Sequence, residues 1–471
     1  MGEIAPKGFL SLVPVIITLL LAFMTKDAIF SLVIGCVIGV VVAGFDPFTG
    51  MSKLLQASLG NADFIWVLMI EVAVGIMIAF YLRANVIKGF ADWSGDKIKS
   101  RRVASGFGWL LGIFIFFSDY FSPLFGGPIA RPITDKFKIS REMLAYTLDS
   151  GSGPICTIIP ITSWGVYVSG LLKGHGSITT ADEGMAAFIK SVPYNFYGWL
   201  AVIVCGLVAF RVIPLFGPMK KAEERALNEG KVLRDGATPL AGEELDNIKP
   251  IQGKPTHMFL HLVVPVTMLI VISVGSFFVL GGVKILETFF IVITYQAILL
   301  SLGGYFENIR DFMSVVTNGI KSVLPAIFIL ALAYCINTIS KSLGAQQFVI
   351  DATQQWMNSL LLPSITFFAG ACISFFTGTS WGTYALLVPL SLPIAFNLSG
   401  GEVSTIVLVT IGSIMGGGVF GDHCSPLSDT TCLSSFGAAS DHMDHVITQL
   451  PFALVCAGAS ILLYLLLGAI L

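Results

Sequence analysis

The sequence predicts an all-α polytopic membrane protein that is built from two inverted repeats. Of its 471 residues, 55% are apolar and only 12% are charged, and the mean hydropathy is +0.84. A soluble domain carries roughly 25% charged residues. Apolar windows of about 20 residues recur along the chain, and each is long enough to cross a bilayer. The net charge of −2 offers nothing to suggest a nucleic-acid partner.

The expected organisation has three parts: a first membrane repeat over 1–216, a linker over 217–256 and a second membrane repeat over 257–471. Each repeat is expected to hold about five transmembrane helices, a re-entrant hairpin and a broken helix. The linker contains KKAEERALNEGKVLRDG (220–236) and is the only stretch with a soluble-like composition. We interpret it as a solvated, cytoplasmic connector.

The first half is expected to cross the membrane near 9–25, 27–44, 63–82, 142–172 and 192–215. Basic residues concentrate in 83–102, 131–141 and 217–256. The positive-inside rule therefore places these three stretches in the cytoplasm. The loops 45–62 and 173–191 have fewer basic residues and are expected outside.

Two apolar arms, 103–117 and 120–134, lie between cytoplasmic stretches, and each is short for a full crossing. We expect a re-entrant hairpin with FFSDYFSP (116–123) at its tip. Two full crossings would give the same sidedness, so charge does not separate these models. The following span is expected to unwind at DSGSGP (149–154), because proline removes a helix hydrogen bond and glycine permits the backbone to turn.

The second half repeats features of the first in the same order. Pro154 to Gly165 can be laid over Pro426 to Gly437, and Phe116-Phe117 over Phe375-Phe376. The pair Pro128 and Pro132 likewise matches Pro389 and Pro393. The stretch 341–358, which corresponds to the basic stretch 83–102, has Lys341 as its one basic residue and is expected outside. Equivalent loops on opposite sides are typical of an inverted repeat with its site at the bilayer midplane.

Four polar breaks are expected to meet at that midplane: the hairpin tips 118–119 and 377–380, and the unwound segments 149–154 and 421–431. Carboxylates at the bilayer centre are costly, so a functional role is the default interpretation. The expected substrate-binding residues are Ser118, Asp119, Asp149, Ser150, Ser152, Gly153, Thr377, Gly378, Thr379, Ser380 and His423. The expected Na⁺ ligands are Asp119, Asp149, Asp422, Ser425, Asp429, Thr430 and Thr431.

Two residues are candidates for a proton relay: Glu71, alone in the third span, and His423. His423 could equally be a core histidine hydrogen-bonded to Asp422. The pair His442 and His445 looks like a solvated helix entrance, and His257 with His261 is a weak zinc signal. The eight cysteines lack paired short spacing, so they are expected to pack in the core. No cofactor is expected apart from Na⁺ as a coupling ion.

At these residues the chain resembles the NhaC family of sodium/proton antiporters, which includes sodium-coupled organic-acid and amino-acid exchangers. The likeness is carried by GDHCSPLSDTTCLSS (421–435), ARPITDKFKISREMLAYTLDS (130–150) and FFSDY (116–120). It implies inverted repeats, two re-entrant hairpins and transport domains that move around a scaffold, often in a dimer. The chain departs from its relatives after Asp149, where GSGP and ICTIIPITSW replace small, apolar residues. This difference leaves the substrate open, because such a pocket suits an organic solute as well as, or instead of, bare ion exchange.

The expected function is sodium-coupled secondary transport by alternating access. The chain would move Na⁺ against H⁺, a small carboxylate-bearing metabolite such as an amino acid or organic acid, or both. A plain Na⁺/H⁺ antiporter is the alternative, and an ion channel or an intramembrane hydrolase is a weaker one, so no catalytic residue is expected. The expected partners are Na⁺, H⁺, the metabolite and the lipid bilayer, with a homodimer left open. The expected location is the plasma membrane, as a multi-pass protein of the bacterial inner membrane.

Overall fold

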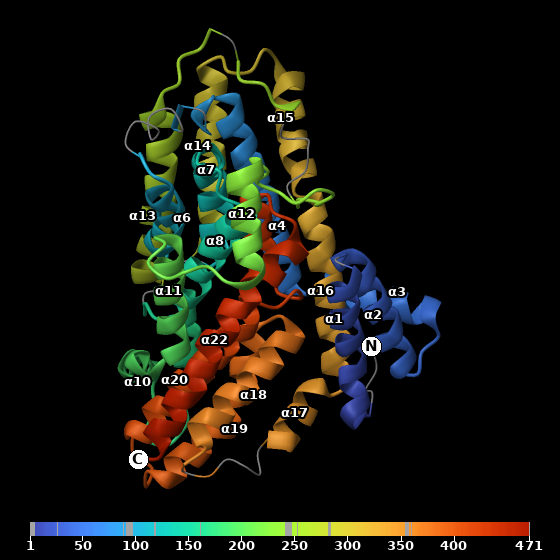
Figure 1. The fold of residues 1–471 in the computed structure, drawn as a ribbon, viewed down its shortest axis with the longest axis vertical. Coiled ribbons are helices and arrows are strands. Elements are labelled where there is room, and N and C mark those ends of the chain that lie inside the picture. Colours follow the sequence, from blue (N-terminus) through green and yellow to red (C-terminus); the bar gives the residue numbers. More distant parts are fainter. Residues whose placement is uncertain are drawn as a thin grey trace.

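The computed structural model describes the chain except residues 1–4, 26, 88, 91–97, 117–118, 161, 241–246, 252, 281–283, 354–357, 359 and 471. The described part is an elongated bundle of helices, with isolated β-bridges in place of strands (Figure 1). Eight of its helices are long and apolar enough to cross a membrane, and up to ten if each bent pair is one span. The predicted all-α, polytopic fold class is therefore confirmed.

The first half begins with the short helix Gly8–Leu12 and the helices α1 (Val13–Thr25), α2 (Ala28–Val42), α3 (Pro47–Leu59) and α4 (Ala62–Arg83). Most of the expected loop 45–62 is therefore helical, and α2 and α3 meet at a bend of 109°. The local sequence explains this difference. Asp46 accepts hydrogen bonds from the backbone N–H groups of Phe48 and Thr49, and Pro47 occupies the first turn.

The two predicted arms form the helices α6 (Arg101–Phe114) and α7 (Phe121–Lys136), and their re-entrance stays a prediction. The helices α8 (Arg141–Cys156) and α9 (Ser163–Leu172) follow. The break in this span was predicted wrongly at 149–154, because α8 continues through those residues to Cys156. Glycine serves helix packing here. A Cβ on Gly112 would lie 2.9 Å from the carbonyl carbon of Gly151, so glycine lets α6 approach α8.

The first half ends with α10 (Ala181–Ser191) and α11 (Phe196–Ala209), and the linker then forms α12 (Gly217–Glu229). One face of α12 is docked on the first half. Glu223 is only 2% exposed, and its carboxylate pairs with Arg101 and Arg211. Arg225 Nη2 lies 2.9 Å from both carboxylate oxygens of Glu142. This part of the linker is therefore a packed helix and not a freely solvated connector.

The second half begins with a short π-helix (Phe259–Val263) and α13 (Val264–Leu280), α14 (Ile285–Leu302), α15 (Ile309–Ser322), α16 (Leu324–Ser342) and α17 (Ala345–Thr353). It ends with α18 (Leu362–Thr377), α19 (Ser380–Leu398), α20 (Thr405–Asp422), α21 (Asp429–Ala438) and α22 (His442–Gly468). In Figure 1, α22 crosses the bundle beside α20, and α16 lies between the bundle and α1–α3.

Both halves contain a helical hairpin followed by a broken helix, namely α6–α7 with α8–α9 and α18–α19 with α20–α21. The hairpins open toward opposite ends of α8–α9. Arg101, at the start of α6, pairs with the linker, whereas Gly401, beyond α19, accepts a hydrogen bond from Ser177, beyond α9. Inversion of the repeats stays a prediction. The pairing of Pro154 with Pro426 does not hold, because Pro154 lies inside α8 and Pro426 lies between α20 and α21.

Candidate functional site

The break between α20 and α21 is the structural centre of the candidate site. It covers residues 423–428 and includes Pro426, which cannot donate a backbone hydrogen bond. The tip of the α18–α19 hairpin rests directly on it. Gly378 adopts a φ of +69°, and a Cβ at this position would lie 2.3 Å from the carbonyl oxygen of Leu427. Glycine is thus required both by the left-handed turn and by the contact.

Asp422, at the end of α20, is surrounded by oxygen atoms from three segments. Its Oδ2 accepts from Ser380 Oγ at 2.5 Å and its Oδ1 from Ser428 Oγ at 3.1 Å. Its backbone carbonyl accepts from Thr430 Oγ1 at 3.1 Å and from Thr431 Oγ1 at 3.2 Å. A carboxylate, hydroxyls and a carbonyl freed by an unwound helix are the ligand types that hard cations such as Na⁺ prefer. We refer to Asp422 and these four hydroxyl residues as the oxygen cluster.

Asp119 and Asp429 lie beside the oxygen cluster and face a cavity of about 950 Å³. Asp429 Oδ2 accepts from Tyr120 Oη at 2.9 Å, and Asp119 Oδ2 accepts from Trp164 Nε1 at 2.9 Å. The predicted tip residues Thr377, Gly378 and Thr379 line the same cavity. The structure therefore brings together predicted residues from α6–α7, α18–α19 and α21.

The remaining cavity wall is aromatic and polar. Its large side chains include Trp66, Tyr120, Tyr167, Tyr334 and Trp381. The polar groups of α16 on this wall include Asn337, Thr338, Lys341 and Ser342. Lys341 supplies the one basic side chain among the lining residues, whereas Asp119 and Asp429 supply the acidic ones. Sequence reasoning placed Lys341 in a loop and missed the α16 face, because its polar residues are too few to interrupt an apolar span.

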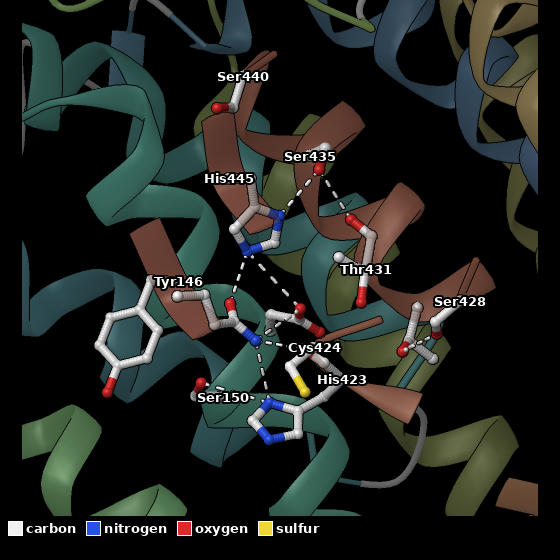
Figure 2. A network of polar contacts seen from close by, with 12 residues as sticks. Tyr146, Ser150, His423, Cys424, Ser428, Thr431, Ser435, Ser440 and His445 are labelled. Atoms are coloured by element: carbon white, nitrogen blue, oxygen red, sulfur yellow. Dashed lines mark hydrogen bonds and ion pairs between the residues drawn. The ribbon is translucent and has the colours of Figure 1, made fainter. Parts of the chain in front are cut away.

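Asp149 belongs to a second centre around His423 and His445, and Figure 2 shows these two histidines. It is fully buried on α8, its Oδ2 accepts from Gln449 Nε2 at 3.1 Å, and the same oxygen lies 3.6 Å from His445 Nε2. Among the described residues, its Oδ1 has no hydrogen-bond partner. Within that same part of the chain, no group of three or more His, Cys, Asp or Glu side chains could hold a metal ion. The four predicted aspartates therefore do not form one shared site.

His423 joins this second centre and does not pair with Asp422. Its Nδ1 lies 3.1 Å from Gln449 Nε2 and 3.5 Å from Ser150 Oγ, and its Nε2 contacts the hydroxyl of Tyr197. Gln449 also donates to the backbone carbonyl of His423. The alternative interpretation was a core histidine hydrogen-bonded to Asp422. It is wrong about the partner, because the ring of His423 contacts Gln449, Ser150 and Tyr197 instead.

The other predicted residues have local roles in the structure. Ser425 Oγ donates to the Phe375 carbonyl at 2.6 Å, and Thr377 Oγ1 donates to the Ile373 carbonyl at 2.8 Å. Ser152 Oγ donates to the Asp149 carbonyl at 3.3 Å, and a Cβ on Gly153 would lie 3.5 Å from His423 Cβ.

Glu71 is buried on α4, and neither of its carboxylate oxygens has a hydrogen-bond partner among the described residues. Ser118 lies outside the described residues.

His442 and His445 were predicted at a solvated helix entrance, and this is wrong. Their side chains are 3% and 0% exposed, because α22 starts beneath the linker, where Arg234 Nε lies 2.8 Å from Asp444 Oδ2. The spacing of His442, His445 and Gln449 places all three on one face of α22, which is the signal that could have identified them. The eight cysteines are free and buried or half-buried, as predicted.

The chain is similar to several known proteins. A family model described as "Na+/H+ antiporter family" matches residues 155–469. An uncharacterized protein of Haemophilus influenzae is 31% identical over 97% of this chain and 90% of its own length. The arginine/ornithine antiporter ArcD of Halobacterium salinarum is 32% identical over 32% of this chain and 30% of its own length. The malate-2H(+)/Na(+)-lactate antiporter of Bacillus subtilis is 26% identical over 37% of this chain and 36% of its own length.

Proposed function

The chain belongs to the Na⁺/H⁺ antiporter family, and from this premise we propose that it is a sodium-coupled secondary transporter of a small, carboxylate-bearing metabolite. It is a multi-pass membrane protein, and its family consists of antiporters and not of enzymes. In the proposed cycle, Na⁺ binds at the oxygen cluster and exchanges against H⁺, while the metabolite occupies the cavity. Alternating access exposes both sites to each side in turn.

The observation that carries this proposal is the size and charge of the cavity. About 950 Å³ is far more than one Na⁺ and its first ligand shell require, and lies within the range of pockets that bind small organic molecules. Lys341 suits a carboxylate group, whereas Asp119 and Asp429 suit an amino group or a cation. The names of two partial relatives, an arginine/ornithine and a malate/lactate antiporter, support the same chemical class.

The proposal is tested in proteoliposomes with an imposed Na⁺ gradient, an internal pH dye and a panel of amino acids and organic acids. We expect at least one metabolite to be driven by the gradient. Lys341→Gln should abolish this flux and leave Na⁺/H⁺ exchange intact, because the lysine lines the cavity and makes no contact with the oxygen cluster. Lys190→Gln, on the exposed side of α10, is the matched control and should transport normally.

A plain Na⁺/H⁺ antiporter is the second candidate, and the family supports it directly. Na⁺-driven H⁺ flux in liposomes without any metabolite, together with no response to the whole panel, would favour it over metabolite transport. We also propose the bacterial inner membrane as the location and leave a homodimer as an assembly that cross-linking in native membranes can test.

A further inference from the structure

The cavity has a mouth at the ends of three helices and a floor inside the bundle. Asn61 precedes α4, Ile285 begins α14 and Ser342 ends α16, and all three residues line the cavity. Leu427 of the break and Gly378 at the tip of the α18–α19 hairpin line it as well. The cavity therefore reaches from the ends of these helices down to the broken helix.

The basic group of the cavity lies at its mouth. The helix α16 forms one wall along the bundle (Figure 1), and its lining residues Ala333, Asn337 and Lys341 are spaced by four positions. This spacing puts them on one face of the helix. Lys341 stands in the last turn of α16 and is exposed, so it is the lining residue that can hold an anionic group near the entrance.

The floor of the cavity is acidic. Asp119 and Asp429 are only 3% and 8% exposed, and they accept hydrogen bonds from Trp164 Nε1 and Tyr120 Oη, which are uncharged donors. Within the part of the chain that the structure describes, no ion pair joins Asp119, Asp429 or Lys341 to a charged partner. A buried carboxylate without a compensating charge is costly. The floor therefore favours a cationic occupant.

Aromatic rings beside these carboxylates favour the same kind of occupant. Trp66 and Tyr120 line the cavity with their ring centroids 5.5 Å apart and their planes nearly perpendicular. Tyr334 of α16 is a third aromatic lining residue. The faces of tryptophan and tyrosine rings attract ammonium groups through the ring quadrupole. Both the carboxylates and the rings thus disfavour a second anionic group at the floor.

The acidic and basic ends of the cavity lie far apart. Cys432 Sγ is 3.8 Å from the carbonyl oxygen of Ala326, in the first turn of α16. Asp429 precedes Cys432 by one helical turn, so its backbone lies within about 5 Å of this level, whereas Lys341 is about 22 Å farther along α16. A lysine stem covers about 6 Å of the remaining distance. About 10 Å then separates the two charged groups, once the short aspartate side chain is included.

We propose that the solute carries an amino group and a carboxylate at opposite ends of a short carbon chain. It binds with the amino group at Asp119 and Asp429 and with the carboxylate at Lys341, which leaves Asp422 and its hydroxyl partners to Na⁺. The two charges of an α-amino acid head group are attached to one carbon, within about 3 Å of each other. Two hydrogen bonds add about 6 Å, so this head group does not reach both ends of the cavity.

The chemical class that fits is therefore the ω-amino acids. This inference rests on the proposed function, because it names the solute of the same cavity. It excludes dicarboxylates of the same length, since one of their carboxylates would face Asp119 and Asp429.

The test is isothermal titration calorimetry of the purified full-length protein in detergent at a constant Na⁺ concentration. The three probes 5-aminovalerate, glutarate and cadaverine have the same five-carbon chain and differ only in their end groups. We expect 5-aminovalerate to bind at least about tenfold more tightly than glutarate, because only the amino acid satisfies both ends of the cavity. Glycine, with its charges on neighbouring atoms, should also bind at least about tenfold more weakly than 5-aminovalerate.

Variants assign the two ends of the solute. Lys341→Gln should weaken 5-aminovalerate about tenfold more than cadaverine, which has no carboxylate to lose a partner. Trp66→Leu should weaken both amines, and Trp66→Phe should recover most of this loss because it keeps an aromatic ring. Lys190→Gln, on the exposed side of α10, is the matched control and should bind the probes like the native protein. Thermal midpoints in detergent verify that each variant is folded.

Glutarate binding as tight as that of 5-aminovalerate, or no binding of 5-aminovalerate, would overturn the proposal. Equal losses for all probes in Lys341→Gln would overturn the assignment of the carboxylate end. Flux in proteoliposomes distinguishes the two proposals. Na⁺-driven flux of glutarate without flux of 5-aminovalerate contradicts this inference and leaves the proposed function standing. Binding of 5-aminovalerate without Na⁺-driven flux of any metabolite contradicts the proposed function and leaves this inference standing.

Discussion

Asp422 is the residue on which the oxygen cluster depends, since both its side chain and its carbonyl accept hydroxyl hydrogen bonds. We expect Asp422→Asn to abolish Na⁺-dependent flux while the protein still folds. The amide keeps the size of the side chain but removes the charge that compensates a bound cation. Asp429→Asn should act in the same direction, because Asp429 faces the adjoining cavity. Flux in proteoliposomes and the thermal midpoint in detergent measure the two effects separately.

Asp182→Asn is the control for these variants, because Asp182 is exposed in the first turn of α10, away from both centres. Its flux should equal that of the native protein. Normal Na⁺-dependent flux in both Asp422→Asn and Asp429→Asn would show that the oxygen cluster is not the Na⁺ site.

Residue chemistry explains which site residues the sequence could identify. Asp422 and Asp429 stand out because an ionisable group in an apolar segment is costly without a role. Tyr120 and Gln449 carry no such signal, since tyrosine and glutamine occur in many helices for packing alone. Only the folded chain places the Tyr120 hydroxyl 2.9 Å from Asp429 and the Gln449 amide 3.1 Å from Asp149.

Among the elements, the α18–α19 hairpin depends on Gly378 both for its left-handed backbone and for its contact with Leu427. A comparison with Gly400 separates these two effects. Both glycines have a φ of +69°, but a Cβ on Gly400 would meet nothing within 4 Å. Gly400→Ala should therefore cost about 1 kcal/mol for its backbone conformation alone. Gly378→Ala should cost clearly more, because its Cβ would also push the hairpin tip away from Leu427. Thermal unfolding in detergent measures the difference, and equal midpoints for the two variants would contradict the contact.

A second element, the linker helix α12, is expected to hold its position through Glu223. Glu223→Gln removes the negative charge that pairs with both Arg101 and Arg211. Breaking a buried ion pair in this way costs about 3 kcal/mol or more. The neighbouring Glu224 is exposed and pairs with Lys220 at 3.8 Å, so Glu224→Gln should change stability by about 0.5 kcal/mol or less. Similar losses in both variants would show that α12 is not docked.

Element boundaries were predicted well where one physical cause operates and poorly where two compete. The second hairpin turns at Gly378 as expected, because its left-handed backbone leaves few other residues acceptable. The prediction of a break at 149–154 was wrong, because glycines in a membrane helix serve close packing as readily as unwinding. Gly151 packs on Gly112 and keeps its helix intact. Sequence alone does not distinguish these two uses of glycine.

At the scale of the whole molecule, the inverted-repeat prediction has a direct test. In a cysteine-free background, single cysteines are introduced at Ser100, Asn228 and Asn358, all of which are exposed. An impermeant thiol reagent should label Asn358→Cys from outside and the other two from inside, because the positive-inside rule places the basic stretches in the cytoplasm. Labelling of Asn358→Cys from the cytoplasmic side alone would contradict inversion.

The overall class followed from composition, because no soluble fold tolerates so few charges over so many apolar windows. The cavity could not be predicted in the same way. Its lining comes from segments as distant as Asn61, Tyr167, Lys341 and Asp429, and no local pattern brings them together. Tertiary packing alone decides that the aromatic rings of α4, α9 and α19 face the same space.

The contact between the second hairpin and α20 restricts how this molecule can change shape. A Cβ on Gly421 would lie 2.0 Å from the Phe375 backbone nitrogen, and one on Gly417 would lie 2.5 Å from the Phe367 carbonyl oxygen. The two backbones thus approach each other closely from Gly417 to Gly421, which is about one turn of α20. Sliding α18 along α20 would break these close backbone contacts. We therefore expect the two helices to move together whenever the molecule changes shape.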